Sequence, residues 1–525
     1  MRLLPLKRVL LANRRHDGYN IKLSMDFLDP KKQRRSRIML SVGYILIAGA
    51  IAIGTVILLF QANGFGFDKN GQIIQNGLVF ISSQPSGASV YLNNTPHKVQ
   101  TNTRMVLQAG TYQVKLSAPG YRDWQRQITV NGGDLQHFDY PFLFPSNLKT
   151  KTIASISATP DVVTQSPDKN WLVVERSDNK ASFDLYDLSN PLTHKTTTIA
   201  VPSSDVTTGD AGQTWVAVDW ASDNRHVLML HSYVVSGQPA HEYVVLDRQT
   251  PDSSVNITKT LTIPAEETLT LFNKKYNQYY AFNHAAGTLR TTSLDNSLNT
   301  QQIAHVLAYK SYGSDIILYA TDVPPNGKVQ TGLVSIVLQQ GQKTYTLRTL
   351  PAGAPQYLLN LATYSGDWYV TIAASNDKGL YIYKNPQTET DNNSGASPSP
   401  WRFLLVANPT YVSFSDNTQF IAVENGQQFA VYDAENVLTY MYKTTQPVDA
   451  PQGHATWMDG DRLMYVSSGK LTVFDYDHQN VQTLQSNDPT FMPAFDPSFK
   501  YVFSVTPGAT PNSASLTSTP LTTLP

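Results

Sequence analysis

A turn motif that recurs through the C-terminal part of the chain constrains its fold more than any other feature. The motif is an aromatic or small residue, a Ser or Asp, a tight turn and then an apolar strand. The clear copies are Gln165–Trp171, Trp220–Val227, Phe414–Phe420, Trp457–Leu463 and Phe495–Tyr501. They recur about every 40–55 residues, a spacing typical of the four-stranded blades of a β-propeller.

Weaker copies at Phe272–Tyr276 and Tyr364–Trp368 extend the pattern to eight units. The units start near residues 160, 214, 269, 303, 357, 409, 454 and 489. Seven blades and a two-sheet β-sandwich array are the alternatives. The eighth unit has only three predicted strands, so we predict that Leu148–Ala154, just before unit one, supplies the fourth and closes the ring.

The sequence of the turns resembles a known class of propeller. Ser166-Pro167-Asp168 and its degenerate copies are similar to the Ser-Pro-Asp-Gly turns of WD40-like and TolB-type propellers. The resemblance extends from about residue 148 to the end of the sequence, without a Trp-Asp or Gly-His signature. It implies a propeller architecture and says nothing about a ligand.

Ile38–Phe60 contains no charged residue and is 23 residues long. As a helix it spans about 34 Å, enough to cross a hydrocarbon core of about 30 Å. Five basic residues lie at positions 31–37, and the first charge after the run is Asp68. We therefore predict an uncleaved single-pass anchor with the N-terminus in the cytoplasm. A cleaved signal peptide, whose apolar stretch is shorter, is the alternative.

The charges are distributed unevenly along the chain. Residues 1–37 hold 11 Lys/Arg and 3 Asp, although the whole chain has 40 basic and 40 acidic residues. The overall neutrality argues against nucleic-acid binding, and the basic segment predicts a cytoplasmic tail. Translation beginning at Met1 or at Met25 remains open. The chain has no cysteine, which excludes disulfides, thiolate nucleophiles and Cys-ligated metals.

Residues 77–140 alternate apolar and polar side chains between Gly, Pro and Asn turns, as strands exposed on one face do. Their motifs resemble a PEGA domain: Pro85-Ser86-Gly87-Ala88, then Val90–Asn93, Leu107–Val114 and Gly120-Tyr121. Ser86 stands where the family usually has Glu, and the hairpin at 94–96 departs from the usual pattern. The resemblance implies a small β-sandwich of envelope or surface proteins, without catalysis.

Catalytic and metal-binding signatures are missing from the sequence. It contains no nucleophile elbow, Walker A loop, dinucleotide fingerprint or His-Glu-x-x-His. His226, His231 and His241 cluster in unit two, but the first two differ by an odd number and would face opposite sides of one strand. We expect no catalytic residue, no cofactor and no metal site.

Two acidic pairs, Asp459/Asp461 and Asp475/Asp477, are the only hint of an enzyme. Glycosidases need such a pair. Asp is also common in turns, where its side chain accepts from its own backbone. We favour the turn role.

Aromatic residues are the better indication of a binding surface. Tyr and Trp offer rigid amphipathic contact area for proteins and sugars alike. They are dense across units three to five. The candidate contact residues are Tyr276, Tyr279, Tyr280, Tyr312, Tyr364 and Trp368.

The sequence thus predicts an all-β chain behind an N-terminal transmembrane helix. Its segments are a basic cytoplasmic tail (1–37), the helix (38–60), a linker (61–76), a PEGA-like β-sandwich (77–145) and a β-propeller of about eight blades (146–525). We expect a protein of the cell membrane whose extracellular propeller recognises an envelope protein, peptide or glycan. A propeller glycosidase or lyase with a carboxylate pair in its funnel, and a structural spacer, are the alternatives.

Overall fold

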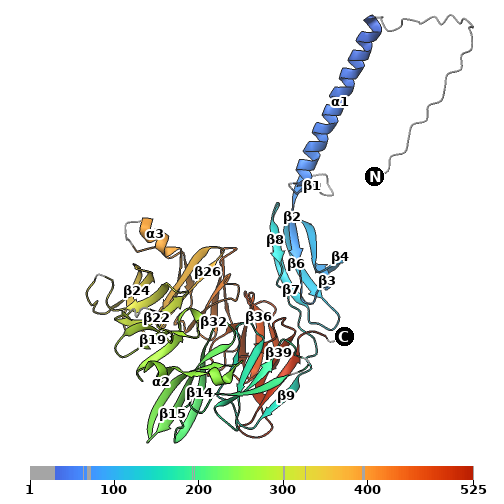
Figure 1. Cartoon of the computed structure of the whole chain (residues 1–525). Coiled ribbons are helices and arrows are strands. Elements are labelled where there is room, and N and C mark those ends of the chain that lie inside the picture. Colours follow the sequence, from blue (N-terminus) through green and yellow to red (C-terminus); the bar gives the residue numbers. More distant parts are fainter. Residues whose placement is uncertain are drawn as a thin grey trace, which may run out of the picture. The chain divides into compact units, whose positions relative to one another are not determined.

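The first described element is a long apolar helix, α1 (Pro30–Ala62), drawn in dark blue in Figure 1. The computed structural model describes residues 30–62, 64–67, 73–191, 193, 195–298, 302–325, 327–392 and 397–523. Within α1, Arg34–Phe60 has a mean hydropathy of 2.5 and no buried residue. The hydroxyl of Thr55 donates to the Ile51 carbonyl at 2.8 Å and so is satisfied within the helix. Length and composition suit a membrane span or a signal sequence. The expected tail before residue 30 lies outside the described residues.

The chain divides into two compact units. The first comprises residues 1–79, 104–111 and 129–137. Its strands belong to one sheet, in which β2 pairs with three others. The strands of this sheet are β1 (Phe65–Phe67), β2 (Ile73–Ile81), β5 (Thr103–Gln108) and β8 (Leu135–Phe138). A Cβ at Gly77 would lie 2.4 Å from a methyl group of Val130, so the close approach of the backbone there requires glycine.

The second unit begins with a four-stranded sheet in the order β4-β3-β6-β7. Its strands are β3 (Ser89–Leu92), β4 (Thr95–Gln100), β6 (Gly110–Ser117) and β7 (Trp124–Val130). Burial alternates strictly along β7, as the sequence pattern predicts. Asn93 and Asn94 both adopt a left-handed backbone in the turn between β3 and β4, a conformation that Asn tolerates in tight hairpins.

Eight four-stranded sheets follow in the described part of this unit, and they are the blades of a propeller. Blade one has β10 (Val163–Gln165), β11 (Trp171–Glu175), β12 (Ser182–Asp187) and β13 (Thr196–Ala200), and blade two has β14 (Ala211–Trp220), β15 (His226–Val235), β16 (Gln238–Asp247) and β17 (Val255–Asn256). Blade three has β18 (Glu267–Leu271), β19 (Gln278–Asn283), β20 (Thr288–Ser293) and β21 (Gln302–Ile303), and blade four has β22 (Val306–Tyr312), β23 (Ile316–Thr321), β24 (Leu333–Gln340) and β25 (Lys343–Pro351).

The remaining blades have the same strand order. Blade five has β26 (Tyr357–Tyr364), β27 (Asp367–Ala374), β28 (Gly379–Lys384) and β29 (Arg402–Leu405), and blade six has β30 (Tyr411–Phe414), β31 (Phe420–Glu424), β32 (Gln428–Asp433) and β33 (Leu438–Lys443). Blade seven has β34 (Thr456–Trp457), β35 (Arg462–Ser467), β36 (Lys470–Asp475) and β37 (Gln482–Ser486). Blade eight has β38 (Ala494–Phe495), β39 (Tyr501–Pro507) and β40 (Ala514–Pro520). Two short α-helices, α2 (Ile257–Leu261) and α3 (Pro386–Asn392), lie beside the sheets.

The ring is closed by a strand from before blade one. β9 (Lys151–Ile156) pairs antiparallel with β40, and Ala154 lies opposite Leu516. Blade eight therefore takes its fourth strand from the other end of the propeller sequence. The predicted closure by residues near 148–154 is confirmed, as is the all-β fold with a propeller.

The repeated turn motif is held by short-range hydrogen bonds. In blade one the Ser166 hydroxyl accepts from the Trp171 amide at 3.0 Å, and in blade six Ser415 accepts from Phe420 at the same distance. Asp459 accepts from the Arg462 amide at 2.9 Å in blade seven. Each side chain fixes the turn that starts the second strand of its blade.

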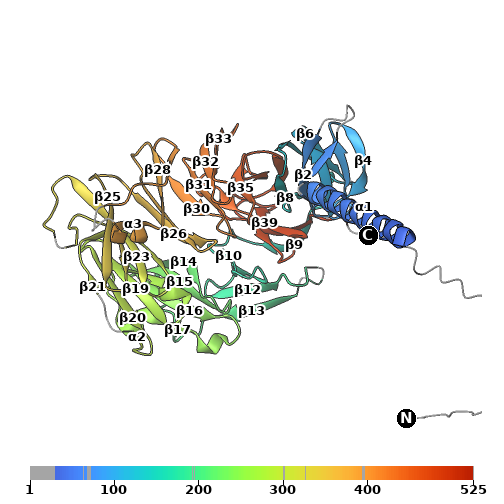
Figure 2. The ribbon, with the colours of Figure 1, turned by 90° about the horizontal axis from the view of Figure 1, so that it is seen from above.

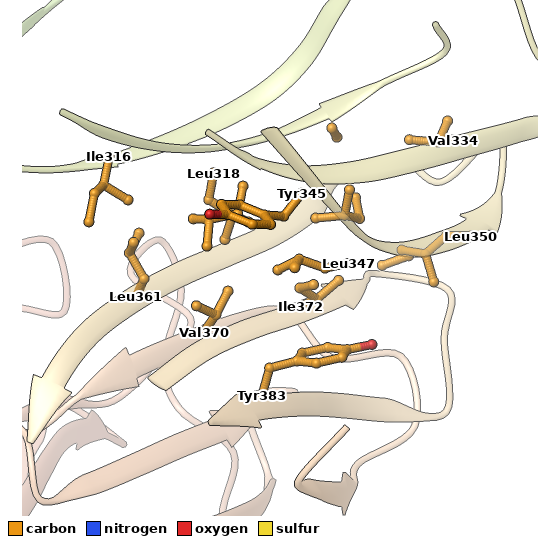
Figure 3. Packing of buried hydrophobic residues seen from close by; sticks show 14 residues of the cluster. Ile316, Leu318, Val334, Tyr345, Leu347, Leu350, Leu361, Val370, Ile372 and Tyr383 are labelled. Atoms are coloured by element: carbon orange, nitrogen blue, oxygen red, sulfur yellow. The ribbon is translucent and has the colours of Figure 1, made fainter. Parts of the chain in front are cut away.

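Apolar side chains fill the spaces between blades. Figure 3 shows the cluster between blades four and five, where Ile316 and Leu318 of β23 face Leu361 and Val370 of the next sheet. All six residues of β23 are buried. Central strands here lose the polar alternation because a neighbouring blade covers each face.

Candidate functional site

The first strand of each blade stands at one end of its sheet, and these strands line the middle of the ring. In Figure 2 the labels of β10, β14, β26 and β30 lie near the centre, whereas β13, β25 and β33 lie at the rim. The first strands of blades two to five and the segment before β26 enclose a cavity of about 1090 Å³. This volume is at the upper end of the range of ligand sites, about 300–1,000 Å³.

Three charged side chains line this channel cavity: Asp219, Lys274 and Lys310. The ammonium group of Lys274 lies 2.5 Å from Oδ1 of Asp219, so these two charges neutralise each other. Lys310, in the middle of β22, has no ion pair or side-chain hydrogen bond within the described chain and remains in contact with solvent. The cavity therefore carries one unpaired positive charge.

The surroundings of Lys310 disfavour its charged form. The protein walls of the channel displace water around the ammonium group, and the like charge of Lys274 adds repulsion, so the pKa of Lys310 is lowered. Asp219 acts in the opposite direction with a smaller effect. An anion bound beside Lys310 would favour its charged form and so raise its pKa.

Aromatic rings form much of the wall beside Lys310. The Tyr309 hydroxyl bonds to Thr270 at 2.8 Å, and its ring packs on Tyr280 and Phe282. Tyr312 and Trp368 form a T-shaped pair with ring centroids 4.9 Å apart. Contacts within the protein therefore hold these rings in place.

A second, smaller hollow adjoins the channel cavity. It has a volume of about 380 Å³, lies between blades one and two, and shares Val218, Asp219 and Lys274 with the larger cavity. The Lys274–Asp219 ion pair therefore stands at the boundary between the two spaces.

The turns between first and second strands form one end of the channel, and an ion pair spans it. Lys169 in the turn of blade one lies 2.9 Å from Asp416 in the turn of blade six. Two blades separate these two along the shorter way round the ring. The ion pair therefore restricts access from this end.

The six aromatic residues predicted as contacts lie in different surroundings, and only some of them can reach a ligand. Tyr312 lines the cavity and is 39% exposed. Trp368 packs on Tyr312, and the Tyr364 hydroxyl donates to Glu435 at 3.1 Å.

The other three lie in or beside blade three. The ring of Tyr276 stacks on His226 with centroids 3.9 Å apart. Tyr279 and Tyr280 are 0% and 1% exposed, so neither offers surface to a ligand. Both were predicted as contact residues, but neighbouring blades cover both faces of β19, so neither is at the surface. Sequence reasoning also missed Lys310, although a lysine inside the apolar run Val306–Tyr312 was a signal.

The acidic pairs make bonds inside the protein. Asp459 bonds to the Arg462 side chain at 2.9 Å, and Asp477 lies 2.9 Å from Arg126. Asp475 accepts from the Trp124 indole at 2.9 Å. Burial raises the pKa of Asp475 to about 7 and that of Asp461 to about 6. None of these carboxylates lines the channel cavity.

Two of the three histidines of blade two, His226 and His231, also have carboxylate partners. His226 Nδ1 lies 2.6 Å from Asp223, and His231 Nδ1 lies 3.1 Å from Glu242. Among the described residues, no group of three or more His, Asp or Glu side chains is placed to hold a metal ion.

These features define a class of protein: a PEGA-containing β-propeller protein with an N-terminal apolar helix. Residues 76–143 match the PEGA domain, which confirms the predicted resemblance. No curated protein matches the chain in sequence.

Solved structures with a similar fold are WD40-type propellers. One is Hsv2 of Kluyveromyces lactis, with a TM-score of 0.38 and 14% identity over 63% of this chain and 99% of that chain. Another is the Cps50 (Swd1) β-propeller domain of Myceliophteria thermophila, with a TM-score of 0.32 and 9% identity over 70% and 99%.

Proposed function

We propose that this protein is a non-catalytic recognition protein of the cell envelope and that the channel cavity of blades two to five is its ligand site. In this proposal α1 is a single-pass anchor with its N-terminus in the cytoplasm, and the propeller lies outside the cell. The asymmetry of basic residues around the apolar run supports this orientation.

The observation that carries the proposal is the channel cavity itself. It is large enough for a ligand of several residues, and its walls come from rigid strands of four blades. It combines apolar side chains with the unpaired ammonium group of Lys310. About half of its lining is polar, so the cavity can offer a ligand hydrogen bonds as well as apolar contacts.

The ion pairs and hydrogen bonds that occupy the acidic side chains favour a binding site over a glycosidase site. Hydrolysis of a glycosidic bond by the usual mechanism needs two carboxyl groups that face the substrate. The channel cavity has one carboxylate, Asp219, and Lys274 neutralises it. In the two acidic pairs found in the sequence, Asp459 holds a turn, Asp475 accepts from the indole of Trp124 and Asp477 pairs with Arg126.

A capture experiment with two matched variants tests the proposal. The full chain, reconstituted in nanodiscs, is incubated with envelope extract and with peptide and glycan arrays. Leu307→Trp narrows the cavity, since Leu307 lines it and is 43% exposed. Leu405→Trp places the same new side chain on the outer strand β29, where Leu405 is 59% exposed.

Ligands retained by the original chain and by Leu405→Trp, but lost from Leu307→Trp, are the expected result. Recovering those ligands chemically unchanged after long incubation is expected of a non-catalytic site. Equal retention by both variants would place recognition elsewhere and overturn the proposal, and so would processed ligands.

A further inference from the structure

We propose that the channel cavity binds an extended peptide and that an acidic side chain of this peptide pairs with Lys310. The inference rests on the proposed function and adds the chemical class of the ligand. Three observations carry it: the unpaired charge, the free backbone edges of the inner strands, and the contacts that already occupy the aromatic rings.

The unpaired ammonium group of Lys310 favours a ligand that carries a carboxylate. Of the three charges that line the cavity, Lys274 and Asp219 satisfy each other at 2.5 Å. Only Lys310 is left without a partner within the described chain, and it lines the cavity while its side chain stays exposed to solvent. One carboxylate beside Lys310 would neutralise the cavity, whereas a second cation there would be repelled.

The inner strands β22 and β26 have backbone groups that could form hydrogen bonds with an extended peptide. In the described chain β22 pairs with β23 alone and β26 with β27 alone, so each has one edge without a strand neighbour. On β26, the Leu361 amide and the Thr363 carbonyl at this edge already bond to the side chains of Asn360 and Thr418. Such an edge presents N–H and C=O groups in a regular order that an extended chain can satisfy. Beside them, Gly353 has a positive φ, and a Cβ at this position would meet no atom within 4 Å, so the backbone of the segment before β26 is open.

The aromatic residues favour a peptide over a sugar. A sugar platform needs a ring face that is free to stack, but the ring of Tyr309 packs on Tyr280 and Phe282. Tyr312 forms a T-shaped pair with Trp368, and its hydroxyl lies 3.3 Å from that of Thr363. Aromatic neighbours therefore already contact both rings, which favours contacts with peptide side chains over stacking on a pyranose ring.

The test uses an array of random hexapeptides in which each sequence appears twice, once with a single glutamate and once with glutamine at that position. Oligogalacturonate is spotted beside them as a carboxylate-bearing sugar. The array is probed with the full chain in detergent, with Lys310→Gln, with the charge-preserving Lys310→Arg, and with Lys470→Gln. Lys470 is an exposed lysine at the start of β36, outside the cavity. Melting temperatures confirm that each variant is folded.

We expect the original chain, Lys310→Arg and Lys470→Gln to bind glutamate peptides about tenfold more strongly than their glutamine twins. Lys310→Gln should remove this preference. Peptide binding without a glutamate preference, a preference that survives in Lys310→Gln, or binding of oligogalacturonate in place of peptides would each overturn the inference. The proposed function fails separately, when Leu307→Trp leaves the binding of all probes unchanged.

Discussion

The guanidinium group of Arg126 on β7 lies 2.9 Å from the carboxylate of Asp477 in blade seven, and both side chains are less than a tenth exposed. The same guanidinium donates to the Tyr476 hydroxyl at 3.0 Å and lies over the ring of Tyr140. Beside it the Trp124 indole donates to Asp475. This buried contact joins the sheet of β7 to the propeller within the second unit.

Replacing Arg126 with Met should destabilise the protein by about 3–5 kcal/mol, because Asp477 would be left as a buried charge without a partner. The double variant Arg126→Met/Asp477→Leu should recover most of this loss. Lys115→Met is the control, since the Lys115–Asp123 pair at 3.6 Å is partly exposed and is worth at most about 1 kcal/mol. Chemical denaturation followed by tryptophan fluorescence measures the free energies. A loss under 1 kcal/mol for Arg126→Met would contradict the prediction.

Opening the ring at β9 should cost more stability than damaging an ordinary outer strand. Ala154→Pro disturbs the pairing of β9 with β40 and thereby the closure between blades eight and one. Thr197→Pro makes the same change on β13, the outer strand of blade one, without touching the closure. We expect the first variant to lower the melting temperature of the full chain further than the second, by circular dichroism. Equal shifts would mean that β9 is dispensable for closure.

The buried carboxyl group of Glu424 should make stability depend on pH. Burial raises the pKa of Glu424 from 4.5 to about 8, and its Oε2 atom makes no hydrogen bond within the described chain. Between these two pH values the folded protein holds a proton that the unfolded chain has released. Stability therefore falls as pH rises through this window, by up to about 1.4 kcal/mol per pH unit.

Glu424→Gln should remove this dependence, because an amide does not titrate. The stability of the variant relative to the original chain should rise steadily from pH 5 to pH 8 in denaturation series. Glu266→Gln, at an exposed position, serves as the matched control and should give no such trend. A constant difference between Glu424→Gln and the original chain across this range would refute the assignment.

The proposed orientation of α1 can be measured in intact cells. Basic residues gather before the apolar run, so a tag fused at the N-terminus should be protected from added protease while the propeller is digested. Permeabilising the cells should then expose the tag. Digestion of the tag in intact cells would reverse the orientation, and loss of the tag from the mature protein would indicate a signal sequence.

The repeat of the blades could be predicted from the sequence because the hydrogen bonds that form each turn join residues close together in the chain. Ser166 and Trp171 are five residues apart, and the hydrogen bond between them fixes one turn without help from the rest of the chain. The same holds for the alternation along β7, where one face of the strand is buried. The match of residues 76–143 to the PEGA domain depends on short motifs of this kind.

The burial of Tyr279 and Tyr280 could not be predicted from the sequence, because it depends on how the blades pack against one another. Both were predicted as contact residues because aromatic residues are dense in this part of the sequence. Each blade has a neighbour on either side, and both rings are covered. The alternation of buried and exposed residues, which holds for a sheet with one face in solvent, therefore does not hold for these propeller strands.

The sequence by itself determined the apolar run of α1, the PEGA motifs and the repeated turns, since each depends on residues close together in the chain. Only the tertiary structure decided which charges meet. Lys274 and Asp219 are 55 residues apart, and Arg126 on β7 meets Asp477 in the turn after β36. Packing of separate sheets against one another brings these groups together and leaves Lys310 without a partner in the described chain, because the pairing of charges depends on distances in space that no local pattern encodes.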